Sequence, residues 1–114
     1  MTTIQTATVE DMGSRWIRVG KTVGKGVVSV GIQKTEARAT ASAVLESIER
    51  WAVDGLTRTT TIPALMGGEI LTVTVTPRGG VRLAYRLPDG DERYLHLTQA
   101  EAADVALQLV GLVE

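Results

Sequence analysis

The clearest change of pattern in the sequence lies within residues 26–53, GVVSVGIQKTEARATASAVLESIERWAV. Its first part has period two, because Val28, Val30 and Ile32 share one face of an extended chain. The apolar residues then recur at helical spacing, in a stripe of Ala37, Ala41, Val44, Leu45, Ile48, Trp51 and Ala52. The pattern predicts a strand that runs into a helix over residues 35–53, with Thr35 as its N-cap and Gly55 as its C-terminal stop.

A second strand precedes this unit from residue 15. Ile17 and Val19 fall on one side of it, and Trp16 and Arg18 on the other. The glycines that follow, at positions 20, 24 and 26, are typical of a hairpin turn. Residues 1–12 form either a flexible arm or an edge strand, the edge strand lying over residues 4–9.

The second half of the chain predicts three strands and a helix. Residues 55–68 read as an internal crossing loop, because Pro63 and two adjacent glycines interrupt the pattern. Alternation over residues 69–76, 81–87 and 92–97 predicts strands, with turns at 78–80 and 88–91. Thr98 and Glu101 form a capping box that opens the last helix. The apolar stripe of that helix comprises Ala102, Val105, Ala106, Leu109, Val110 and Val113.

Together these elements predict a two-layer α+β fold. We expect an antiparallel sheet of about five strands, covered on one face by two helices, in the order β-β-α-β-β-β-α. The 114 residues suit a single domain, because a chain of this length buries enough surface for one core. Both halves contain strand, strand and helix, the second with an extra strand, which indicates either a degenerate internal duplication or two units that obey the same packing rules.

Composition removes several classes of protein. The chain has no cysteine, one histidine and a formal net charge of −1, so thiolate metal sites and a global attraction for polyanions are not expected. The first twelve residues lack the cationic and apolar parts of a signal peptide. The longest charge-free stretch, residues 59–68, is half of the roughly 20 residues that a spanning helix needs. We therefore expect a cytoplasmic protein without a membrane segment.

No catalytic or metal-binding motif emerges. Lys21 and Lys25 stand among glycines, but the spacing is not that of a phosphate-binding loop, so this segment reads as a flexible basic hairpin tip. An enzyme would have to use His96, the only histidine, and no serine or carboxylate is placed by the pattern to work with it. The acidic residues 89, 91 and 92 belong to a turn and lack calcium-loop spacing. We expect no enzyme, no metal and no cofactor.

The polar side of the sheet predicts a binding surface. Arginines alternate there with rings and join the basic hairpin tip, in a set comprising Trp16, Arg18, Lys21, Lys25, Arg82, Arg86, Tyr94 and His96. Tyrosine, tryptophan and arginine are enriched at protein interfaces, and the same residues also suit single-stranded nucleic acid.

Our leading expectation is a small adaptor or regulator that binds a protein partner and forms a homodimer. Leu107 and Leu112 lie off the stripe of the last helix and supply the expected dimer contact. The alternative is a nucleic-acid-binding module that uses the basic and aromatic sheet face.

Overall fold

Strands and helices follow one another in two successive units. The computed structural model describes residues 7–13, 15–62, 70–86 and 89–113. The first unit consists of β1 (Thr8–Asp11), β2 (Trp16–Val23), β3 (Gly26–Gln33) and α1 (Lys34–Asp54). The second consists of β4 (Arg58–Ile62), β5 (Ile70–Val75), β6 (Val81–Arg86), β7 (Glu92–Leu97) and α2 (Gln99–Val113). Each unit is therefore a run of strands that ends in a helix, while the internal duplication stays a prediction.

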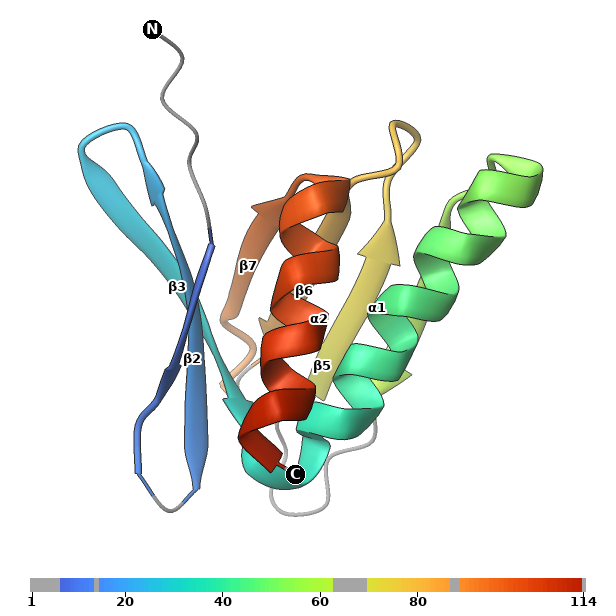
Figure 1. The fold of residues 1–114 in the computed structure, drawn as a ribbon. Coiled ribbons are helices and arrows are strands. Elements are labelled where there is room, and N and C mark those ends of the chain that lie inside the picture. The colour runs from blue at the N-terminus through green and yellow to red at the C-terminus, as the bar shows by residue number, and fades with distance from the viewer. Residues whose placement is uncertain (1–6, 14, 63–69, 87–88, 114) are drawn as a thin grey trace, which may run out of the picture.

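The strands form two antiparallel sheets, one of order β1-β2-β3 and one of order β4-β5-β6-β7. Figure 1 shows α1 and α2 side by side on one face of the four-stranded sheet, with the three-stranded sheet standing beside β7. The other face of the four-stranded sheet carries neither α1 nor α2 (Figure 1). The predicted α+β class, the antiparallel strands and the two helices on one face are confirmed.

The strands are more numerous than the sequence pattern indicated, and they divide between two sheets. Of the two predictions for the N-terminal segment, the edge strand is the one observed, as β1 over residues 8–11. Residues 1–6 lie outside the described part of the chain. β4 lies inside the segment predicted to be a crossing loop, and it pairs with β5 from Arg58 opposite Val75 to Ile62 opposite Leu71. That prediction was wrong for residues 58–62 because three threonines replace the apolar alternation that identifies a buried strand.

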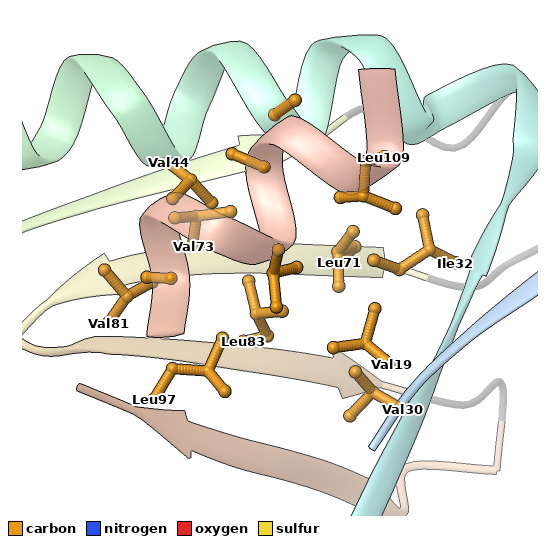
Figure 2. Close-up of a cluster of buried hydrophobic side chains, with 14 of the residues drawn as sticks. Val19, Val30, Ile32, Val44, Leu71, Val73, Val81, Leu83, Leu97 and Leu109 are labelled. Carbon is orange, nitrogen blue, oxygen red and sulfur yellow. The ribbon is translucent and has the colours of Figure 1, made fainter. Parts of the chain in front are cut away.

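One buried cluster joins both sheets to both helices (Figure 2). The four-stranded sheet contributes Leu71, Val73 and Leu83, which are at most 1% exposed. Val44 of α1 and Leu109 of α2 cover them from the helical layer, as Figure 2 shows. The three-stranded sheet closes the flank with Val19, Val30 and Ile32. Because burial of one such side chain contributes about 1.5–3 kcal/mol, this cluster holds the two sheets together.

The ends of α1 show where local signals succeed and fail. The N-cap is Gln33, in an extended conformation and without a side-chain capping bond, so the predicted cap at Thr35 is wrong. β3 ends at the residue before the helix begins, and the sheet therefore sets the starting point. At the other end Gly55 has a φ of +68° and donates its N–H to the carbonyl of Trp51 at 2.7 Å, which confirms the predicted stop.

The buried face of α1 is rotated from the predicted stripe. Leu45 is 38% exposed and Ala52 is also exposed, whereas Thr40 and Ser47 are buried. The Thr40 hydroxyl donates to the carbonyl of Glu36 at 2.8 Å, so its burial leaves no unsatisfied donor. α1 packs on α2 as well as on the sheet, and small side chains allow that approach. Neither helix is long and apolar enough to cross a membrane within the described ranges.

Candidate binding surfaces

The uncovered face of the four-stranded sheet brings four of the predicted site residues together. Register places Arg82 opposite His96 and Arg86 opposite Glu92, with Ala84 opposite Tyr94 between them. Threonines extend the same face toward the sheet edge, namely Thr59, Thr61, Thr72 and Thr74. Arg82, Arg86, Tyr94 and His96 therefore lie on one face, as the alternation predicted.

Tyr94 forms the centre of this face with Arg82 and His96, which we name the Tyr94 cluster. The Arg82 guanidinium carbon lies 6.0 Å from the centroid of the Tyr94 ring, a cation–π arrangement. The His96 ring meets Tyr94 edge to face, at 5.6 Å between centroids and 83° between planes. Tyr94 is nevertheless 52% exposed. Two neighbouring side chains therefore support the Tyr94 ring, and about half of the residue remains exposed to solvent.

A hollow of about 280 Å³ borders the Tyr94 cluster on the same face. Its floor includes Ala84 and Thr72, and its rim includes Thr61, Arg86 and Glu92. Ala84 is 3% exposed although it lies on the helix-free face, because the side chains around it are larger. The exposed Tyr94 ring therefore lies beside a hollow that is lined mainly by polar side chains.

The charges of this face largely cancel. Arg86 lies 3.7 Å from a carboxylate oxygen of Glu92, and both side chains are exposed. Among the described arginines of this face, Arg82 is the one whose charge Glu92 does not offset. Its Nε is buried without a hydrogen-bond partner among the described residues. Binding to a nucleic-acid backbone draws most of its affinity from neutralising several phosphates, so this face provides little of that attraction.

Trp16 and Arg18 do not join the Tyr94 cluster, because they belong to the three-stranded sheet. The Trp16 ring packs on Gly31 and meets Tyr85 edge to face at 6.2 Å. Arg18 pairs with Glu10 at 2.9 Å at an exposed position. The single polar face expected from the sequence is therefore divided into two surfaces.

Lys21 is not part of a free basic hairpin tip. Its ammonium lies 2.7 Å from a carboxylate oxygen of Glu101, and the two side chains are only 15% and 7% exposed. Lys25 alone remains at the exposed tip between β2 and β3. The alternation of side chains along β2 could have predicted this position of Lys21, because Lys21 falls on the same side of the strand as Ile17 and Val19.

Glu101 is the ion-pair partner of Lys21, and the sequence pattern did not connect the two residues. It also completes the predicted capping box of α2, because its N–H donates to the Thr98 hydroxyl at 3.2 Å and its carboxylate accepts the Thr98 N–H at 2.9 Å. Burial raises the pKa of Glu101, but the hydrogen bonds from Lys21 and Thr98 outweigh burial and hold its pKa below the ordinary value. The carboxylate is therefore ionised at neutral pH.

The expected dimer residues lie on α2. Leu107 is 66% exposed, and Leu112 is 38% exposed near the end of the helix. Within the described ranges, no group of three or more histidine, aspartate or glutamate side chains is arranged to hold a metal ion. His96, the residue that an enzyme would have to use, contacts the Tyr94 ring. Comparison with known protein families, with curated proteins and with solved structures found no match.

Proposed function

We propose that the protein is a small non-enzymatic adaptor that binds a protein partner through the helix-free face of the four-stranded sheet. The observation that carries the proposal is the half-exposed Tyr94 ring, held between Arg82 and His96 beside a hollow. Tyrosine and arginine contribute most of the affinity at many protein interfaces. A ring already packed by its neighbours loses little conformational entropy on binding, which favours its use as an anchor.

Single-stranded nucleic acid is the second candidate for the same face. Bases stack on exposed rings, and Arg82 over Tyr94 is a combination that such proteins use. The charge of the face favours a protein partner, since Glu92 offsets Arg86 and leaves Arg82 as the main cation among the described side chains of this surface.

The test compares wild type with Tyr94→Ala and with the control Arg38→Gln, an exposed position on α1. Immobilised wild type and control should retain the same partner from a lysate of the source cells. Tyr94→Ala should lower the affinity of the purified partner at least about tenfold, because truncation of an interface anchor costs more than one decade in the dissociation constant. Isothermal titration calorimetry with the purified partner measures that change.

Two results would overturn this assignment. Equal affinity of wild type and Tyr94→Ala for the purified partner would move the contact away from this face. The other result is tight binding of labelled single-stranded DNA or RNA at physiological salt, measured by fluorescence anisotropy and abolished by Tyr94→Ala. It would show that this face binds nucleic acid in place of a protein.

The proposal includes a homodimer formed through the outer side of α2. Leu107 is 66% exposed, and a dimer interface would remove that apolar surface from water. In sedimentation velocity we expect wild type to migrate as a dimer at micromolar concentration and Leu107→Glu as a monomer, because an interface carboxylate would be desolvated without a counter-ion. Leu56→Glu, at a 59% exposed position outside the helices, is the matched control and should remain dimeric. A monomeric wild type would remove the dimer from the proposal.

A further inference from the structure

A second surface lies apart from the Tyr94 cluster, where the edge of β3 meets the ends of β6 and β7. It is a groove of about 400 Å³, which we name the Trp16 groove. Its lining includes Met12, Trp16, Arg18, Gly31, Tyr85 and Arg93. A volume of this size falls within the range of pockets that hold small molecules, which is roughly 300–1,000 Å³.

The walls of the Trp16 groove are aromatic and held in place. The Trp16 ring lies on the backbone of Gly31 so closely that a β-carbon there would be 3.3 Å from a ring carbon. Tyr85 meets the same ring edge to face, at 6.2 Å and 76°. Trp16 itself is only partly buried. The groove therefore offers a positioned aromatic surface against which a planar group can pack.

The charges of the groove select an anion. Among the described residues that line it, Arg18 and Arg93 are the charged ones and none is acidic. Arg93 is exposed and has no hydrogen-bond or ion-pair partner within the described part of the chain. Arg18 pairs with Glu10 at 2.9 Å, so its charge is already offset. The Arg93 guanidinium is therefore the group that is available to an incoming carboxylate or phosphate.

We infer that the Trp16 groove binds a small aromatic anion, that is, a planar ring bearing a carboxylate or a phosphate group. The ring packs against Trp16, and the anionic group accepts hydrogen bonds from Arg93. This binding site is separate from the protein-binding face, because its residues come from the three-stranded sheet and from the opposite face of β6 and β7. Binding of a small molecule here and of a protein at the Tyr94 cluster are thus independent properties.

The test uses two probes that share a ring and differ in charge, naphthalene-2-carboxylate and 2-naphthylmethanol. In ¹H–¹⁵N spectra of the full chain, the carboxylate should shift the Gly31 amide and the Trp16 indole N–H in a saturable manner below millimolar concentration. The alcohol should bind about tenfold more weakly, since it lacks the charge-assisted hydrogen bonds. The shifts report occupancy directly and do not depend on any activity.

Variants separate the ring from the charge. Arg93→Gln should weaken the carboxylate about tenfold and leave the alcohol unchanged. Trp16→Leu should weaken both probes. Arg86→Gln, an exposed arginine on the other face, should bind both like wild type. Because Arg93 is exposed and pairs with no other described residue, its replacement should leave the spectrum of the folded protein otherwise intact.

Any of three outcomes would overturn the inference. The first is the absence of shifts at Gly31 and Trp16 at millimolar carboxylate. The second is equal affinity for acid and alcohol, and the third is unchanged carboxylate affinity in Arg93→Gln. Tyr94→Ala should bind the carboxylate normally, so loss of the proposed partner and loss of this site are distinguishable results.

Discussion

Replacing Lys21 with methionine should destabilise the protein by about 3 kcal/mol, because the change leaves the Glu101 carboxylate buried without its counter-ion. The two groups are 2.7 Å apart, and the pair ties β2 to the first turn of α2. Methionine keeps much of the length of the lysine side chain, so the loss arises mainly from charge. Urea unfolding followed by circular dichroism at pH 7 measures the free energy of unfolding.

The stability difference between Lys21→Met and wild type should depend on pH in a definite direction. In wild type the pKa of Glu101 lies below its ordinary 4.5, because the hydrogen bonds from Lys21 and Thr98 outweigh burial. Its contribution to stability is therefore present above the pKa of the unfolded chain and lost as the pH falls through the lower, folded pKa. In Lys21→Met the burial remains and Lys21 is gone, so protonation of Glu101 becomes less costly to the folded state. The gap between variant and wild type should narrow as the pH falls through about 4.5.

Two control variants isolate the ion pair. Lys21→Met combined with Glu101→Gln should recover much of the lost stability, since no uncompensated charge stays buried. Arg18→Met removes a cation from the exposed pair with Glu10 and should change stability by at most about 1 kcal/mol. A loss in Arg18→Met equal to that in Lys21→Met, or a gap that does not change with pH, would contradict the assigned role of Glu101.

Gly79→Ala should destabilise the protein by about 3 kcal/mol, which is the other large effect we expect. Gly79 has a φ of +84°, and an L-residue with a positive φ costs about 1–2 kcal/mol. A β-carbon at this position would lie 2.7 Å from two carbons of the Trp51 ring. Either the Trp51 side chain of α1 or the turn before β6 must therefore move. Overpacking of this kind adds about 1–3 kcal/mol.

Gly90 provides a matched control for the backbone contribution. Its φ is +95°, but a β-carbon there meets no described residue within 4 Å. Gly90→Ala should therefore lose only the backbone part, about 1–2 kcal/mol. The difference between the two variants reports the contact with Trp51, and it should disappear when both are made in a Trp51→Leu background. Thermal and urea unfolding of the four variants measure these values. Equal losses at Gly79 and Gly90 in wild-type background would show that Trp51 does not limit this turn.

Local patterns were sufficient where neighbouring residues decide the structure. The Thr98 and Glu101 capping box formed as predicted, because its two hydrogen bonds join residues three apart. Gly55 ended α1 for a similar reason, since a glycine can adopt a positive φ without steric cost whatever its neighbours are. Arg82 and His96 met on one face because a short turn and a two-residue period define the register of β6 and β7.

Tertiary structure alone decided the rest. The separation of the strands into two sheets depends on how Val19, Val30 and Ile32 pack on the helical layer, and no local pattern encodes that choice. It moved Trp16 and Arg18 away from Tyr94 and created the Trp16 groove. Lys21 and Glu101 lie 80 positions apart in sequence, so their contact follows from the docking of the three-stranded sheet beside α2. Local patterns thus predicted both helices and the strands other than β4, whereas long-range burial determined how the strands divide into two sheets and which faces meet.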